Sequence, residues 1–285
     1  MSQGAYAQTY RVPGHAVGDV VYKVLRHRDV KLWLAEVDLL STLRHPNVIR
    51  CVDIWEGSEL AIVMPYGGRS VHTFIHEIHR GVHPLISWNQ LVPQVLMGVC
   101  ALHEAQVIHT DIKPANMVVD GFQHLRLIDL GSAVVDREEH RALWMPTVRE
   151  HASIALGTLW YRAPELLLGW REFTKAVDIW AVGVSIWEMW VGHALVEANC
   201  DSLQTRGLIS VFSPLDRKSL RFLKQLPGWD DGYAHVQPRP LLWRDRLESA
   251  APSGEYAHWL KALLLVHPQH RPMAKGAFNA LVYAT

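Results

Sequence analysis

The chain has 285 residues, of which 49% are hydrophobic and 20% charged, so it has enough apolar material for a substantial core and does not resemble a disordered segment. Lysine plus arginine and aspartate plus glutamate each number 28, so the chain lacks the basic excess of a nucleic-acid binder. We therefore expect one compact unit, or two lobes that share an interface, and no nucleic-acid partner.

Cysteine usage and the N-terminal sequence indicate the compartment. Cys51, Cys100 and Cys200 are odd in number and widely spaced, which is typical of free thiols rather than of a disulfide framework or a zinc site. The 17 histidines are scattered, and we expect no metal site among them. We see no signal peptide and no stretch of about 18 uncharged apolar residues, so we expect an intracellular protein, cytoplasmic or nuclear or both, that does not enter a membrane.

The first sixty-odd residues are rich in strand-like segments. Their patterns predict strands at 8–12, 19–25 and 60–64, and a helix at 30–43 that ends before a His-Pro pair. Gly67 and Gly68 then interrupt the pattern.

Helical patterns dominate after these glycines. An amphipathic helix is predicted at 91–105, and two short strands follow at 116–119 and 125–128. The nearly all-apolar run at 174–190 predicts a buried helix. Residues 214–253 are turn-rich, and a last helix is predicted at 256–266. We therefore expect a small β-rich lobe, a glycine hinge and a larger helical lobe, with a cleft between the two lobes.

The strongest chemical signal is the segment HTDIKPAN at 109–116. Phosphoryl transfer to a hydroxyl needs a carboxylate that orients the nucleophile, a cation beside the moving group and a metal held by oxygen ligands. Asp111, Lys113 and Asn116 offer these three functions in turn. Thirteen residues after Asn116, Asp129 in the triplet DLG offers a second metal-binding carboxylate, which suits magnesium. Each residue alone is as well explained as a turn residue, but together they indicate phosphoryl transfer.

These segments, followed by Ala-Pro-Glu at 163–165, resemble the eukaryotic protein kinases over nearly the whole chain. The resemblance implies an α+β bilobal protein kinase fold, with a small antiparallel sheet lobe carrying one helix at 1–66 and a larger, mainly helical lobe at 67–285. It implies ATP and Mg²⁺ as cofactors, with Asn116 and Asp129 as metal ligands. It also implies that Lys23 binds phosphate and pairs with Glu36, that an aspartate at 178 braces the catalytic loop, and that an arginine at 271 pairs with the glutamate at 165.

The same resemblance places the nucleotide. Met64 matches the gatekeeper, while Pro65 and Gly67 belong to the hinge, where a proline carbonyl and a glycine N–H can serve adenine. The glycine-rich loop aligns with SQGAYA at 2–7, in which Gly4 is the only glycine and Ala7 stands at the last glycine position. The added Cβ atoms predict weakened ATP binding. Because the chain begins inside this loop, we expect the small lobe to lack its first strand, either because the protein is longer than this chain or because the small lobe has a frayed edge.

The segment GTLWYRAPELLLG at 157–169 resembles the cyclin-dependent and mitogen-activated kinases. In that group the arginine matched by Arg162, next to Gly157, shapes a pocket for proline after the target residue. Thr158 and Lys113 match serine/threonine kinases, so the resemblance implies proline-directed phosphorylation of protein substrates. Two alternatives stay open: a pseudokinase or scaffold with weak or no transfer, and a small-molecule kinase of the aminoglycoside or choline type.

Regulation departs from that group. The activation-segment phosphosite falls on Ser153, but the three arginines expected to bind the phosphate are replaced by Ala35, Thr110 and Val134. We therefore expect activity that does not depend on phosphorylation of Ser153. The alternative is a substitute basic pocket formed by Arg137, Arg141 and Arg149 of the same segment. The helix at 30–36 does not match a cyclin-recognition sequence, so a cyclin partner cannot be inferred. Trp33 on this helix either marks the surface for another activator protein or packs in the core.

Overall fold

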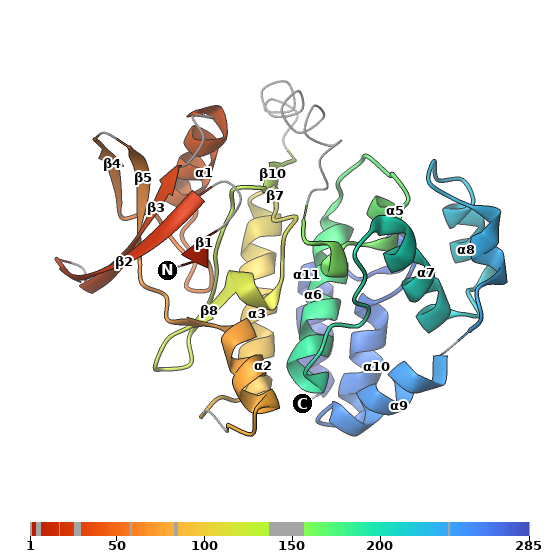
Figure 1. Ribbon diagram of the computed structural model, residues 1–285. Helices are drawn as coiled ribbons and strands as arrows, with labels where there is room; N and C mark the ends of the chain where they lie inside the picture. The colour runs from red at the N-terminus through yellow and green to blue at the C-terminus, as the bar shows by residue number, and fades with distance from the viewer. Residues whose placement is uncertain are drawn as a thin grey trace.

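The computed structural model describes residues 2–3, 7–16, 18–25, 30–57, 59–82, 85–136, 157–238 and 240–284. A small lobe is built on an antiparallel five-stranded sheet, and a larger lobe is mainly helical (Figure 1). The bilobal α+β architecture expected from the sequence is confirmed. The sheet has the order β1-β2-β3-β5-β4, with β1 at Ser2–Gln3, β2 at Ala7–His15, β3 at Gly18–Leu25, β4 at Asp53–Glu56 and β5 at Leu60–Pro65.

Strand β3 is central in this sheet and places Lys23 opposite Thr9 of β2 and Ile62 of β5. The outer strands differ from the sequence prediction. In β1, Ser2 pairs with Thr9, although the sequence predicts no strand before β2. Two residues are too few to show a periodic pattern. All four residues of β4 are exposed, so this edge strand shows no alternation either.

Helix α1 (Val30–Thr42) packs on the small lobe and is one residue shorter than predicted. Trp33, Val37 and Leu40 recur at helical spacing and are buried, and Glu36 lies on the same face. Because Trp33 is only 5% exposed, it is a core residue and does not mark an activator surface. Because the apolar face of α1 packs inward, the Glu36 carboxylate on that face also points toward the interior.

Two 17-residue helices form the centre of the larger lobe. Helices α3 (Trp88–Glu104) and α6 (Lys175–Val191) contact each other, and α6 is buried at every residue from 177 to 189. A helix covered on all sides needs no polar face, which explains its apolar sequence. The surrounding helices are α2 at Val71–His79, α5 at Pro164–Leu167, α7 at Asp201–Phe212, α8 at Arg217–Leu223, α9 at Pro240–Ala250, α10 at Gly254–Leu263 and α11 at Ala274–Ala284.

The interpretation of residues 214–253 as turn-rich is wrong. They contain α8, the 3-10 helix η3 (Asp231–His235) and α9. Among the α9 side chains that the structure describes, Trp243 and Leu247 are the buried apolar ones, so the helical repeat is sparse. Helices α2, α7 and α11 are also missing from the predicted elements, while the predicted last helix corresponds to α10.

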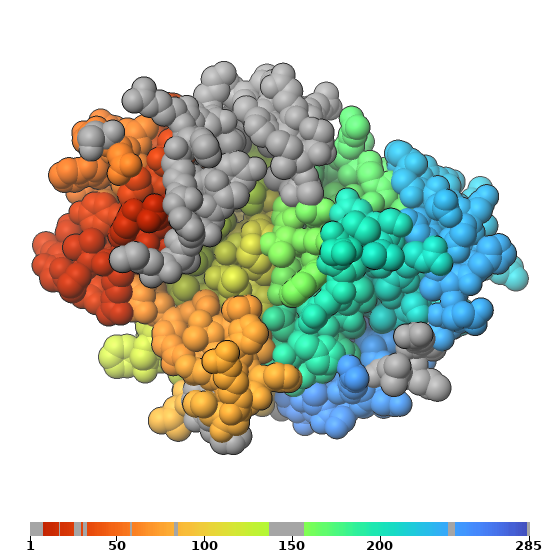
Figure 2. Space-filling model, in the orientation of Figure 1, coloured from red at the N-terminus to blue at the C-terminus, as the bar shows by residue number. Residues whose placement is uncertain are grey.

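Short strands lie beside the small lobe. Strand β7 (Val107–Ile108) pairs with β10 (Val134–Val135), and β8 (Met117–Val119) lies between β6 (Arg69–Ser70) and β9 (Leu125–Leu127). The 3-10 helix η1 (Pro114–Asn116) leads into β8. Figure 2 shows the same face of the molecule with its side chains, with the N-terminal strands in red and the last helices in blue. No described helix combines the length and apolarity that a bilayer crossing needs.

Candidate active site

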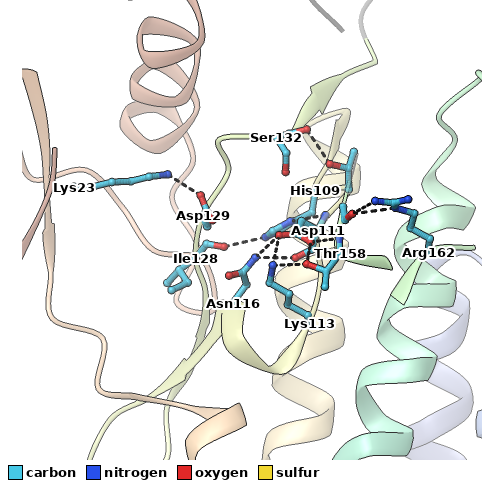
Figure 3. A network of polar contacts seen from close by, with 12 residues as sticks. Lys23, His109, Asp111, Lys113, Asn116, Ile128, Asp129, Ser132, Thr158 and Arg162 are labelled. Carbon is cyan, nitrogen blue, oxygen red and sulfur yellow. Dashed lines mark hydrogen bonds and ion pairs between the residues drawn. The ribbon is translucent and has the colours of Figure 1, made fainter. Parts of the chain in front are cut away.

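Lys23 joins three elements that are distant in sequence. Its Nζ lies 2.5 Å from Glu36 Oε1 on α1 and 2.6 Å from Asp129 Oδ1 on the turn after β9. Figure 3 shows Lys23 extending toward Asp129 from the small lobe. The side chains of Lys23 and Glu36 are nearly buried, whereas that of Asp129 is 45% exposed. One cation therefore holds an inner carboxylate and an outer one that solvent can reach.

The opposite charges of Lys23 and its carboxylate partners stabilise each other. The Lys23 ammonium lowers the pKa of Asp129 to about 2 and outweighs the partial burial of this carboxyl group, which raises the pKa. Burial alone lowers the pKa of Lys23, but the two carboxylates outweigh it and leave that pKa raised. Lys23 and Asp129 are therefore both charged at neutral pH, as a site for phosphate and metal requires.

The catalytic loop forms a second group around Asp111. Lys113 Nζ lies 2.6 Å from Asp111 Oδ2 and 2.5 Å from Thr158 Oγ1. Thr158 donates to Asp111 Oδ1 from its amide at 2.8 Å and from its hydroxyl at 2.9 Å. Because donors hold both of its oxygens, the Asp111 carboxylate has a fixed orientation (Figure 3).

Asn116 is positioned by the same carboxylate. Its Nδ2 donates to the Asp111 carbonyl at 2.9 Å and to Asp111 Oδ2 at 3.0 Å. The planar amide therefore turns its oxygen away from Asp111, to the side on which Asp129 lies (Figure 3). An amide oxygen and the second oxygen of Asp129 form the kind of small, hard donor set that Mg²⁺ prefers.

The buried side chain of Asp178 hydrogen-bonds to the backbone of the catalytic loop. Asp178, which is fully buried near the start of α6, accepts from the amides of His109 and Thr110 and contacts His103 Nε2, each at 2.9 Å. Thr110 has a φ of +67°, a conformation that β-branched residues rarely adopt. Its hydroxyl donates to the Ser132 carbonyl at 2.8 Å. The bracing role expected of Asp178 therefore has its partners in place.

The hinge follows β5, where the gatekeeper position Met64 is buried. At Gly68, φ is +105° and a Cβ atom would lie 1.9 Å from the Val119 carbonyl oxygen, so only glycine fits. Pro65 ends β5, Gly67 packs against β8, and the Tyr66 amide donates to the Asp19 carbonyl at 2.8 Å. Gly4 and Ser153 lie outside the described residues. Ala7 begins β2, but its side chain is not among those described.

Arg162 is locked beside the catalytic loop. Its Nε and Nη2 donate to the Gly157 carbonyl at 3.0 and 2.8 Å, and its Nη1 lies 2.8 Å from Asp201 Oδ1. Gly157 has a φ of +78°, and a Cβ atom there would lie 2.6 Å from the Thr110 carbonyl oxygen. Glycine at this position thus lets the activation segment approach the loop while its carbonyl faces Arg162.

The expected pair of Glu165 and Arg271 is present as a buried bidentate contact at 2.7 and 2.8 Å. Arg271 also donates to the carbonyls of Leu265, Ala176 and Val266, so the buried charge is fully hydrogen-bonded. This contact ties α5 to the loop before α11 and supports the segment that carries Arg162.

Sequence reasoning missed three participants: His103, Ser132 and Asp201. Each acts through a partner more than 20 residues away, so no local pattern marks it. Of the three, His103 alone has a signal in the sequence, because it is a polar residue in an otherwise apolar stretch of α3.

Comparisons with known proteins place the chain in a family. Residues 1–281 match the family model described as Protein kinase domain. A probable CTD kinase subunit alpha homolog of Encephalitozoon cuniculi is 28% identical over 210 residues, 73% of this chain and 60% of that protein. Cell division control protein 2 homolog 3 of Trypanosoma brucei brucei is 27% identical over 290 residues, 98% of this chain and 88% of that protein.

Among solved structures, the yeast RNA Pol II CTD kinase CTDK-1 complex contains a similar chain. The TM-score is 0.78 at 21% sequence identity, over 98% of this chain and 92% of that chain, which is a likeness of fold. The family match spans nearly the whole chain and agrees with the geometry around Lys23 and Asp111. The chain therefore belongs to the protein kinase domain family.

Proposed function

We propose that this protein is a serine/threonine protein kinase that transfers the γ-phosphate of ATP to protein hydroxyls and prefers a target followed by proline. The observation that carries the proposal is the 2.6 Å contact between Lys23 and Asp129, which unites the two lobes at a charged site. One of the two relatives is a kinase by name, and the protein kinase family generally uses ATP and Mg²⁺.

The donor set at the site fits magnesium and nucleotide. Asp129 contacts Lys23 through one oxygen, and Asn116 turns its amide oxygen to the same side. These two residues would hold the metal, while Lys23, held by Glu36, would pair with nucleotide phosphates. When bound, ATP would supply the phosphoryl group and Mg²⁺ would neutralise part of its negative charge.

The loop residues provide the acceptor side of the reaction. Asp111 orients the substrate hydroxyl and takes its proton, since it is the carboxylate with fixed orientation on this loop. Lys113 contacts both Asp111 and Thr158 and places a cation where negative charge develops on the moving group. Thr158 ties the activation segment to Asp111, so that substrate binding and catalysis share one hydrogen-bond network.

Binding of ATP and Mg²⁺ has a direct test. In a thermal-shift assay, ATP with Mg²⁺ should raise the Tm of the wild-type protein more than ATP with EDTA does. Asp129→Asn should remove the magnesium-dependent part of this shift. A shift that is equal with and without magnesium in both proteins would contradict the assigned metal ligands.

The preference for proline follows from the Gly157 carbonyl. Arg162 already donates two hydrogen bonds to this oxygen, so a substrate amide beside it would find no acceptor there. Proline lacks an N–H and loses nothing on binding. A library of peptides that vary the residue after serine or threonine should show enrichment of proline, and equal use of alanine would refute this part of the proposal.

A pseudokinase is the competing function. It would keep the fold but need not keep Lys23, Asp111, Asn116 and Asp129, and all four are present here in contact with their expected partners. The small-molecule kinase alternative has lost its support, because the family matched over residues 1–281 is that of protein kinases.

Protein substrates are the partners that this function requires. An activator protein would find an apolar surface on α1, where Val30 and Leu34 are exposed on the helix that carries Glu36.

The three cysteines, Cys51, Cys100 and Cys200, are free thiols, which supports an intracellular location in a reducing compartment.

A further inference from the structure

Two histidines face each other on the exposed side of α2. His72 and His76 are exposed, and their Nε2 atoms lie 3.0 Å apart, with ring centroids separated by 4.3 Å and planes at 77°. Residues four apart lie on the same face of a helix, so the backbone holds the two rings together. The histidines show no metal-ligand spacing in the sequence, and this pair stands out only through the distance between its rings in the structure.

The separation of the two nitrogens fits one metal ion. Zinc binds histidine nitrogen at about 2.0–2.1 Å, so two such ligands lie about 2.9 Å apart at a right angle and about 3.4 Å apart at a tetrahedral angle. The observed 3.0 Å lies between these limits. At this distance the two rings can share only one proton, so at least one nitrogen presents a lone pair rather than an N–H.

The ligand chemistry selects the kind of cation. Imidazole nitrogen suits Zn²⁺, Cu²⁺ and Ni²⁺, whereas Mg²⁺ and Ca²⁺ prefer oxygen. Within the part of the chain that the structure describes, no third histidine, cysteine or carboxylate completes a cluster here. Thr73 follows His72 where a metallopeptidase helix carries glutamate, so the pair lacks the general base of that chemistry. An ion held by two histidines keeps its other positions open to water or to an incoming ligand.

The helix that carries His72 and His76 contacts the catalytic loop. Helix α2 directly follows the hinge and β6, and its buried residues Val71 and Ile75 lie on the side opposite to solvent. The helix packs against η1, which contains Asn116. In Figure 2, α2 (orange) forms part of the visible surface. A cation bridging one turn of α2 would stiffen a helix that supports the catalytic loop.

We propose that His72 and His76 form a two-histidine site for a transition-metal cation of the Zn²⁺, Cu²⁺ or Ni²⁺ class, separate from the magnesium site of the active centre. The proposal does not depend on phosphoryl transfer. It predicts binding of one such ion on α2 in the absence of nucleotide.

The test uses the full chain without an affinity tag and CuCl₂ as the probe. Electron paramagnetic resonance at one equivalent of Cu²⁺ should show a bound ion with nitrogen ligands, and calorimetry with ZnCl₂ should show the same site. His72→Gln and His76→Gln should each lose this binding, whereas His79→Gln, on the same helix, should keep it. Because the replaced side chains are exposed, the metal-free Tm of all three variants should match that of the wild type.

A second measurement separates a metal site from a simple hydrogen bond between the rings. Zn²⁺ should raise the Tm of the wild-type protein, EDTA should reverse the rise, and the double variant with both glutamines should show no rise. Unchanged copper spectra in the double variant, or no binding by the wild type, would overturn the proposal. Loss of binding in His79→Gln alone would also overturn it.

Discussion

Thr110 donates its hydroxyl hydrogen to the carbonyl of Ser132 at 2.8 Å, and this bond joins the catalytic loop to the segment that carries Asp129. Thr110 stands where related kinases have an arginine that binds an activating phosphate. Its amide is also held by Asp178. A neutral hydrogen bond and a buried carboxylate therefore hold the loop.

The first prediction concerns Ser153. Because Ala35, Thr110 and Val134 supply no positive charge, phosphate on Ser153 would lack the arginines that order this segment in related kinases. Ser153→Ala should keep the kcat/KM of the wild type for a peptide substrate, and phosphatase treatment should leave the wild type equally active. Activity that falls by orders of magnitude in either experiment would show that a phosphate is required.

The second prediction concerns the Thr110 hydroxyl. Thr110→Val keeps the shape of the side chain but removes one hydrogen bond, so unfolding free energy should fall by about 1 kcal/mol, measured by urea denaturation. The loop should also lose order, seen as a lower kcat at unchanged KM for ATP. Thr110→Ser, which keeps the hydroxyl, is the matched control. Equal kcat in the valine variant and the wild type would remove the role assigned to this bond.

Removal of the Asp178 carboxylate should lower the unfolding free energy more than removal of the Thr110 hydroxyl does. Asp178→Ala leaves the amides of His109 and Thr110 without their acceptor, and each buried unpaired donor costs about 1–3 kcal/mol. We expect a loss of several kcal/mol in unfolding free energy. Asp245→Ala removes an exposed carboxylate and should change that free energy by no more than about 0.5 kcal/mol. Similar effects of the two substitutions would argue against the brace.

Arg162 should control substrate preference. Arg162→Lys removes the two donors that occupy the Gly157 carbonyl, since a single ammonium cannot reproduce the fork of a guanidinium. The ratio of kcat/KM between peptides with proline and with alanine after the target residue should fall toward one. A ratio that stays at the wild-type value in the lysine variant would place the origin of the preference elsewhere.

The pH dependence follows from the pKa of Asp129, which Lys23 lowers from 3.8 to about 2. A carboxyl group with a lowered pKa in the folded state stabilises the protein above its unfolded pKa, and this stabilisation is lost as pH falls toward the folded value. The difference in unfolding free energy between wild type and Asp129→Asn should therefore be constant from about pH 5 to 8 and shrink below about pH 4. A difference that already declines near neutral pH would contradict the charged pair.

Much of the site could be predicted because it depends on local sequence. Asp111, Lys113 and Asn116 lie within six residues, and Asp129 follows a short strand, so the motifs that resemble protein kinases identify all four. The partners of these residues could not be predicted in the same way. Asp201 reaches Arg162 from α7, and that helix has too weak an apolar repeat to have been recognised.

The helices and strands likewise divide into those with a clear sequence pattern, which were predicted, and those without one. Strongly periodic or fully apolar helices such as α3 and α6 were predicted to within three residues. Helix α9 and the edge strand β4 bury few side chains and carry little pattern, so contacts made elsewhere in the chain decide their structure.

Transfer of labelled phosphate tests the central claim most directly. The wild-type protein, supplied with Mg²⁺ and γ-labelled ATP, should phosphorylate serine or threonine in a peptide where proline follows the target. Asp111→Asn should lower kcat by about 10²–10⁴-fold while the thermal shift with ATP and Mg²⁺ remains. Equal, background-level labelling by the wild type and Asp111→Asn would mean that the protein keeps the fold of a kinase without its chemistry.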